Sequence, residues 1–141
     1  MQPIRIFASF DRNRDGDLHE RLALQSRSPD SPFEVADWSG REAASEALDG
    51  DPGLPARIEQ VDVVIVLCGE HTDSCVDVSH ELRTAQSLGK PYFMVWGRRE
   101  HTCTKPVGSK ANDSMYTWIW TLLKFQIGLE IRKGALRGSP A

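Results

Sequence analysis

The sequence predicts an α/β protein with a mainly parallel sheet and helices on both faces, and two observations predict it. Residues 61–67 (VDVVIVL) are almost continuously apolar and β-branched, which is typical of a strand buried on both faces of a parallel sheet. Segments with helical spacing alternate with the strand-like segments, and this alternation requires parallel strands joined by helices. The length of 141 residues fits one domain.

Four segments are expected to be strands. Residues 4–10 alternate in side-chain polarity, residues 33–37 form a short second strand, and residues 61–67 the third. Residues 92–96 (YFMVW) are apolar throughout. Residues 98–113 read as a long polar loop with room for a fifth short strand.

Helices are expected between and after the strands, over residues 17–25, 41–48, 55–60, 76–88 and 115–127. Asp73 and Ser74 are candidate N-caps for the helix at 76–88, and Gly89 followed by Pro91 is a strong stop signal.

The last helix is expected to carry an apolar stripe and to end at Gly128. The residues of that stripe are Met115, Trp118, Ile119 and Leu122. We therefore expect one domain over residues 1–130 and a flexible C-terminal tail over residues 131–141.

Composition excludes several classes of protein. The net charge of −3 argues against a broad nucleic-acid-binding face, and no apolar run approaches the roughly 18 residues that span a bilayer. The N-terminus lacks the pattern of a secretory signal. Three widely spaced cysteines, Cys68, Cys75 and Cys103, make a poor disulfide framework, which points to a reducing cytoplasm.

Two motifs resemble known sites but are incomplete. Residues 11–17 match the start of an EF-hand calcium loop, but the position of the bidentate glutamate is Leu22 and a strand replaces the preceding helix. Cys68 and His71 lie close in sequence as a nucleophile and base, without an evident third group to orient them. No metal or cofactor site is expected.

Glu81 is the candidate catalytic residue. In a helix over 76–88, Val78, Leu82 and Ala85 define the face toward the sheet, and Glu81 lies on the edge of that face. Such a carboxylate sits near the carboxyl ends of parallel strands, where open α/β sheets bind ligands. The alternative is a partly exposed glutamate paired with a nearby cation.

Further candidate binding residues gather at the same edge. Phe7 and Ser9 share one face of the first strand, Asp11 follows that strand, and Asp37 and Trp38 follow the second. An aromatic ring beside a carboxylate can stack on a planar cation, although a residue such as Phe7 is more often plain core, and Trp38 could equally be a surface packing residue. The phosphate-binding loop of P-loop proteins and the dinucleotide fingerprint are both absent from the sequence.

Five segments resemble the TIR-like proteins and keep the order of the elements of that family. They cover residues 5–11, 31–39, 61–71, 79–82 and 90–97. More closely, they resemble the small stand-alone bacterial and archaeal branch that includes the Thoeris anti-phage sensor family ThsB. The resemblance implies a flavodoxin-like sheet with strand order 2-1-3-4-5. For active members it also implies cleavage of the N-glycosidic bond of NAD, with an ADP-ribose-based signal passed to a separate effector protein.

The resemblance also implies roles for residues. Glu81 matches the catalytic glutamate, Phe7 matches an active-site aromatic residue, and residues 37–39 open a loop that covers the nucleotide and mediates assembly. We therefore expect a homo-oligomer that takes NAD as substrate, with a phage component as a possible trigger. One carboxylate suits this reaction, because nicotinamide is already a cationic leaving group and only the oxocarbenium-like ribose needs stabilisation.

One departure leaves alternatives open. Many active TIR domains carry tryptophan four residues before the catalytic glutamate, and here that position is Asp77. A non-catalytic TIR-like adaptor or scaffold is therefore an alternative to the enzyme, and a nucleotide-sensing module is another. A flavodoxin-like regulator is a weaker third possibility.

Overall fold

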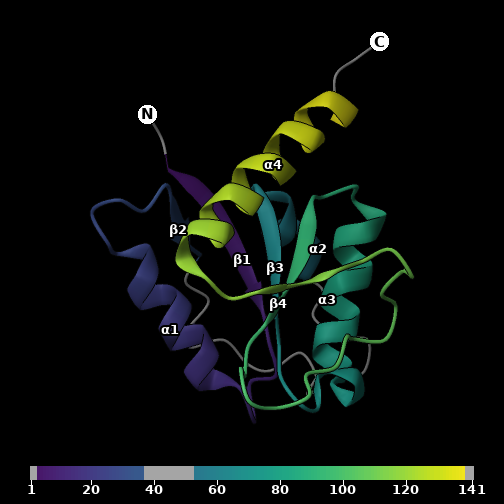
Figure 1. The fold of residues 1–141 in the computed structure, drawn as a ribbon. Coiled ribbons are helices and arrows are strands. Elements are labelled where there is room, and N and C mark those ends of the chain that lie inside the picture. The colour runs from purple at the N-terminus through teal and green to yellow at the C-terminus, as the bar shows by residue number, and fades with distance from the viewer. Residues whose placement is uncertain (1–2, 37–52, 139–141) are drawn as a thin grey trace.

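The computed structural model describes residues 3–36 and 53–138, with side chains as far as residue 133, and it confirms the expected α/β architecture. The described strands form one sheet in the order β2-β1-β3-β4-β5, and all neighbours are parallel (Figure 1). The strands are β1 (Ile4–Ser9), β2 (Phe33–Val35), β3 (Val63–Cys68), β4 (Tyr92–Trp96) and β5 (Met115–Thr117). The helices are α1 (Gly16–Ser26), α2 (Leu54–Glu59), α3 (Val76–Ser87) and α4 (Trp120–Gly138), with the short 3-10 helix η2 (Thr72–Ser74) before α3.

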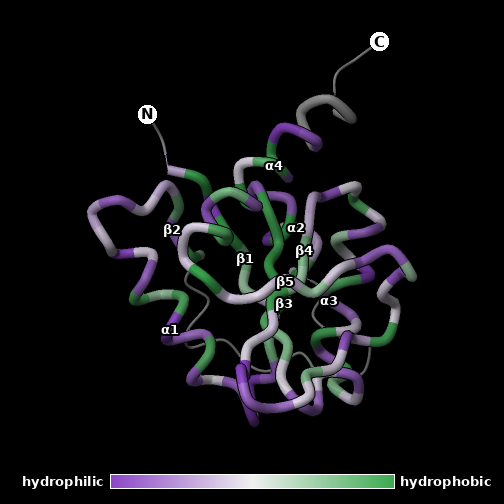
Figure 2. Tube along the Cα trace, in the orientation of Figure 1, coloured by the Kyte–Doolittle hydropathy of each residue, from purple (hydrophilic) through white to green (hydrophobic). Residues whose placement is uncertain are grey.

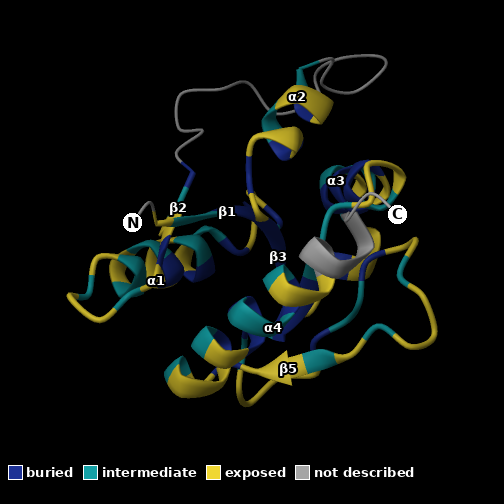
Figure 3. Cartoon of the chain, turned by 90° about the horizontal axis from the view of Figure 1, so that it is seen from above, coloured by how far each residue is buried: buried dark blue, intermediate teal, exposed yellow. Residues whose placement is uncertain are grey.

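Helices cover both faces of the sheet. Figure 3 shows α1 and α4 on one side and α2 and α3 on the other. The strand β3 between them is buried along its whole length, which explains why its sequence is apolar without alternation. In β1, Ile6 and Ala8 join the core on the α1–α4 side, whereas Phe7 joins the core on the α2–α3 side. Because side chains alternate across a strand, Ser9 shares the α2–α3 side with Phe7.

Local patterns account for the two best-predicted helices. In α1, Leu18 and Leu22 lie four residues apart and are both buried, and Figure 2 shows this helix alternating between hydrophobic and hydrophilic residues. The helix α3 stops where expected, because Gly89 has a φ of 66°, a conformation that glycine adopts without steric cost.

The expected N-caps of α3 are wrong. Asp73 and Ser74 belong to η2, and the residue that precedes the first turn of α3 is Cys75, which makes no side-chain capping bond. The backbone N–H of Cys75 instead bonds to the carbonyl of Thr72 at 3.1 Å, so this 3-10 turn continues the chain directly into the helix.

The expectations for the last helix are also wrong. Met115 pairs with Met94 and Thr117 with Trp96 as strand β5, so the fifth strand lies after the loop at 98–113 rather than inside it. The backbone groups at the edge of β4 form hydrogen bonds with these residues. A helix over the same residues would leave that edge of β4 without these partners. The helix α4 therefore begins only at Trp120.

The apolar stripe of α4 also differs from the expected one. Ile119 is 43 % exposed and Leu122 is 48 % exposed, whereas Leu123 and Ile127 are buried against the sheet. Because the helix begins later than expected, a different set of its side chains faces the sheet. Gly128 does not end the helix, which continues to Gly138, so most of the expected C-terminal tail is helical.

Some expectations fall outside the described residues. These are the helix at 41–48 and the last residue of the second strand, Asp37. Across residues 3–36 and 53–138, no helix has both the length and the apolar character needed to cross a bilayer.

Candidate functional site

Three elements bring Glu81 together with two polar side chains at the carboxyl end of the sheet. Ser9 is the last residue of β1, and Arg12 lies in the loop that follows it. Glu81 lies in the second turn of α3, the helix that covers the same face of the sheet as Ser9. Parallel strands all present their carboxyl ends at one edge, so residues from distant parts of the chain meet there.

Both oxygens of the Glu81 carboxylate have a partner. The Ser9 hydroxyl donates to Oε1 at 2.6 Å, and Nη2 of Arg12 donates to Oε2 at 3.3 Å. The first bond is short, as expected when a hydroxyl donates to a carboxylate. The second is also an ion pair. Glu81 thus sits between a neutral donor and a cation.

Burial governs the protonation of Glu81. The residue is 2 % exposed, and removal from water disfavours the charged form. Burial raises the pKa of Glu81 from 4.5 to about 7, while Arg12 and the Ser9 hydroxyl oppose the rise. Near neutral pH this carboxyl group is therefore poised between its charged and neutral forms, which suits a functional group.

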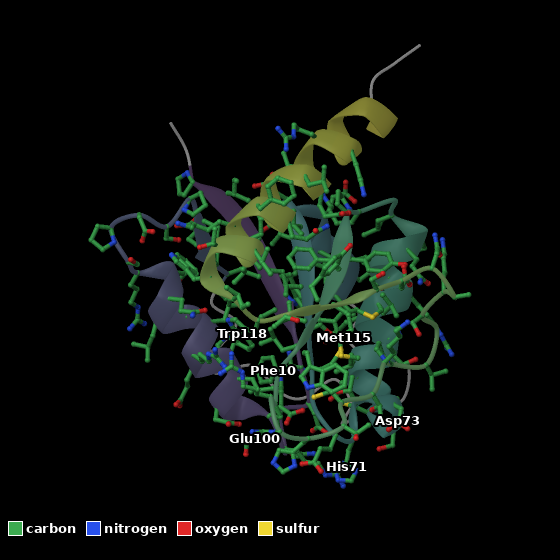
Figure 4. All side chains as sticks on the ribbon, in the orientation of Figure 1. Phe10, His71, Asp73, Glu100, Met115 and Trp118 are labelled. Atoms are coloured by element: carbon green, nitrogen blue, oxygen red, sulfur yellow. The ribbon has the colours of Figure 1, made fainter. Side chains whose placement is uncertain are left out.

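Arg12 is less constrained than the carboxylate that it contacts. Its side chain is 31 % exposed, and its guanidinium lies 5.5 Å from the centre of the Phe10 ring. Phe10 in turn stacks on His19, with ring centres 4.8 Å apart. Figure 4 shows Phe10 at the end of the sheet where these loops gather. Arg12 is therefore the more accessible of the two donors to Glu81.

Asp11 shapes the loop that carries Arg12. It is 3 % exposed, and its Oδ1 accepts the backbone N–H of Asn13 at 3.0 Å and that of Arg14 at 3.3 Å. Such bonds from an aspartate to the backbone two and three residues on stabilise a tight turn. The carboxylate expected to bind a ligand is thus used in building the turn.

A second buried carboxylate, Asp15, joins the same loop to the end of β4. Nη2 of Arg98 donates to Oδ1 of Asp15 at 2.9 Å, and Arg98 also contacts both carboxylate oxygens of Asp17. Asp15 packs so closely on Gly69 that a Cβ at this glycine would lie 2.3 Å from Oδ2 of Asp15. The carboxylates of the EF-hand-like segment therefore bond to the protein's own backbone and arginines.

Phe7 lies on the same side of the sheet as Glu81 but belongs to the core. It is fully buried and packs in a cluster that includes Val64 and Ala85. Ala85 is one helical turn beyond Glu81, so the cluster that holds Phe7 includes the turn of α3 that follows Glu81. In this structure the ring of Phe7 has no exposed surface, and a role in substrate binding stays a prediction.

The remaining sequence candidates divide into two kinds. Asp37 and Trp38 lie outside the described residues. Cys68 and His71 are described but unsuited to act as nucleophile and base, because Cys68 is buried while His71 is exposed. Burial raises the pKa of Cys68 to about 12, so at neutral pH it is a thiol, which is a poor nucleophile.

Sequence reasoning missed Arg12, Asp15 and Arg98. Asp15 carried a signal only as part of the calcium-like motif, and the two arginines carried none, since each acts through a partner far away in sequence. The cluster as a whole offers a buried carboxylate in a low-dielectric position, a hydroxyl that fixes its orientation and a partly exposed cation beside it. Such a carboxylate can stabilise positive charge that develops on a bound sugar.

Comparison with known proteins identifies a family. The family model described as Thoeris protein ThsB, TIR-like domain, matches residues 7–102, which is more than half of the chain. The matched region includes Ser9, Arg12 and Glu81 and ends before β5. No curated protein matches the chain.

Proposed function

The chain belongs to the family of TIR-like domains of the Thoeris protein ThsB, and from this membership we propose that it cleaves NAD between nicotinamide and ribose to make a nucleotide signal in anti-phage defence. The observation that carries the proposal is the buried Glu81 carboxylate held by Ser9 and Arg12 at the carboxyl end of the sheet. The proposed substrate is NAD, and Glu81 is the proposed catalytic residue.

The proposed reaction requires little from the protein beyond a carboxylate held close to the ribose. Nicotinamide leaves NAD as a neutral molecule, so no general acid is needed to protonate it. Positive charge then develops on the ribose carbon and ring oxygen, and ionised Glu81 close to the ribose lowers the energy of that state. Because the carboxylate is buried, its field is little screened by water.

Ser9 orients the reacting carboxylate. Its bond to Oε1 fixes the rotation of the Glu81 side chain and favours the ionised form, since a hydroxyl donor stabilises negative charge. The proposed reaction needs this ionised form. Ser9 is therefore a positioning residue in the proposal, acting through Glu81.

Arg12 has to move when NAD binds. A carboxylate oxygen can accept more than one hydrogen bond, but Glu81 is only 2 % exposed, so a ribose hydroxyl reaches it only when a covering side chain moves. Arg12 is the more exposed and more distant partner, so it is the one displaced. Once released, its guanidinium is free to contact the negatively charged pyrophosphate of NAD.

The proposed activity is tested by incubating the purified protein with NAD, alone and with lysate from phage-infected cells, and measuring released nicotinamide by chromatography. We expect Glu81→Gln to lower the rate by about a hundredfold or more, the effect of removing one such electrostatic group. The matched control is Glu20→Gln, which removes an exposed carboxylate of α1 and should leave the rate unchanged.

A different outcome separates the enzyme from an adaptor. Equal nicotinamide release by wild type and Glu81→Gln under both conditions would reject the catalytic role. If cells carrying Glu81→Gln also keep full resistance to phage, the chain acts as a non-catalytic scaffold instead. Asp77, in the first turn of α3, is the sequence feature that motivates this alternative.

A further inference from the structure

A cavity lies away from Glu81, at the carboxyl ends of β4 and β5. Its volume is about 440 Å³, which is within the usual range for small-molecule sites. The lining residues are Arg21, Trp96, Gly97, Arg99, Thr117 and Trp118. Arg21 comes from α1, and Trp118 packs in the core cluster on the α1–α4 side of the sheet, whereas Glu81 lies on the α3 side.

One wall of the cavity is built to hold an arginine in place. The guanidinium carbon of Arg21 lies 4.3 Å from the centre of the Trp118 ring. Trp118 is buried, and its indole N–H donates to Oε1 of Gln25 at 2.8 Å, so the ring cannot turn. Figure 4 shows Trp118 beside α1 and the start of α4. An arginine stacked on a fixed ring keeps its N–H edge available for an anion.

The positive charge in this cavity belongs to Arg21 and Arg99. Among the described residues, no acidic side chain lines the cavity, and none forms an ion pair with Arg21 or Arg99. The neighbouring Arg98 is different, since Asp15 and Asp17 both pair with it. Two arginines lining one cavity of an acidic protein produce a local positive potential that favours an anion.

The remaining lining residues add one polar group to the cavity. Thr117 brings a hydroxyl that can donate to a phosphate oxygen. Trp96 is half-buried and packs against the core cluster on the α3 side of the sheet, and its indole N–H donates to the Arg98 carbonyl at 2.8 Å. The cavity thus offers two cations and a hydroxyl for a phosphate.

We propose that this cavity binds a small phosphorylated ligand, such as a nucleotide, through contacts of Arg21 and Arg99 with its phosphate group. The site is separate from the one proposed to cleave NAD, and its existence does not depend on that activity. The small positive surface favours a small phosphorylated ligand over a polynucleotide, because two arginines are the only cations among the described residues that line the cavity.

The test is calorimetric titration of the full chain carrying Glu81→Gln, so that no ligand is consumed. The probes are AMP, ADP-ribose, inorganic phosphate and adenosine. We expect saturable binding of AMP, ADP-ribose and inorganic phosphate, and none of adenosine. Arg21→Gln and Arg99→Gln should each weaken nucleotide binding by about tenfold to a hundredfold, the range for a lost hydrogen bond to a charged group.

Three controls keep the result interpretable. Arg27→Gln removes an exposed arginine just after α1 and should leave binding unchanged. Arg21→Lys keeps the charge but loses the stacked, forked donor, so it should bind with intermediate strength. The melting temperature of each variant shows that it is folded.

Several outcomes would overturn the proposal. These are no saturable binding of either nucleotide, unchanged binding in both Arg21→Gln and Arg99→Gln, or tight binding of a single-stranded oligonucleotide with none of AMP. Binding that Arg12→Gln abolishes and Arg21→Gln does not would place the nucleotide beside Glu81 and also reject the second site. A failure of NAD cleavage leaves all these outcomes unaffected.

Discussion

The hydroxyl of Ser9 and the carboxylate of Glu81 are joined by a hydrogen bond of 2.6 Å, although 72 residues separate them in the chain. The bond connects the end of β1 to the second turn of α3 in a position that water does not reach. A bond to a charged partner in such a position is stronger than at the surface. It links the geometry of the sheet directly to the protonation of the carboxylate.

Replacing Ser9 is expected to change the pH dependence of the proposed reaction. Ser9→Ala removes a donor that lowers the pKa of Glu81, so the pKa rises further and less of the carboxylate is ionised at pH 7. We expect nicotinamide release to fall by about tenfold at pH 7 and to recover as the pH rises. Ser9→Thr, which keeps the hydroxyl, is the control, and a loss that is independent of pH would contradict this role.

Arg12→Gln is expected to shift the same pH profile to the alkaline side. Arg12 is the largest influence holding the Glu81 pKa down, against the effect of burial. Its removal leaves the carboxylate with only Ser9 as a donor among the described residues. The matched variant Arg14→Gln removes a guanidinium that contacts Asp11 at 3.4 Å instead and should not shift the profile. Profiles of both variants that overlay the wild type would exclude the coupling.

Glu81 should also make folding stability depend on pH. Its pKa is about 7 in the folded protein against an ordinary value of 4.5, so between these values the folded state binds more protons than the unfolded state. The stabilisation is complete below about pH 4.5 and is lost as the pH rises through 7. We therefore expect Glu81→Gln to melt at a higher temperature than wild type at pH 8, with the difference shrinking toward pH 5.

Comparing Glu81→Gln with wild type separates the effect of Glu81 on stability from the effects of other carboxylates. The pKa of Asp17 is lowered by its hydrogen bond to Arg98, so this group acts in the opposite direction in both proteins and cancels. Melting curves recorded from pH 5 to pH 8 provide the measurement. A temperature difference that stays constant over this range would mean that Glu81 ionises normally.

Two glycine substitutions are expected to act in opposite directions. At Gly69 a Cβ would lie 2.3 Å from the Asp15 carboxylate, so Gly69→Ala should destabilise the protein by about 1–3 kcal/mol and displace Asp15 from Arg98. At Gly128, inside α4, a Cβ would have no neighbour within 4 Å. Gly128→Ala should therefore stabilise the protein by about 0.5–1 kcal/mol. Denaturant unfolding measures both changes, and a stabilising Gly69→Ala would contradict the packing at Asp15.

Much of the fold follows from local pattern. The continuous apolar run of β3, the spacing of Leu18 and Leu22 in α1, and Gly89 after α3 each correspond to a structure stabilised by near neighbours. The inward position of Glu81 follows in the same way from its place between Val78 and Ala85. Periodicity alone places that side chain on the buried edge of its helix.

The end of the chain shows where local pattern misleads. Residues 115–117 have spacing compatible with a helix, but the open edge of β4 pairs with them as β5. The competing interaction comes from a strand about 20 residues away in sequence, and no helical period contains that information. The same choice moves the start of α4 and reverses which of Leu122 and Leu123 is buried.

By itself, the sequence determined the order of strands and helices in the core and the side chain most suited to chemistry, because both depend on residues within one or two turns of each other. Only the tertiary structure decided what surrounds Glu81. Its contact with Arg12 spans 69 residues, and the contact of Arg98 with Asp15 spans 83. These pairs meet because parallel strands bring their following loops to one edge of the sheet. The protonation of Glu81 is therefore a property of the folded chain.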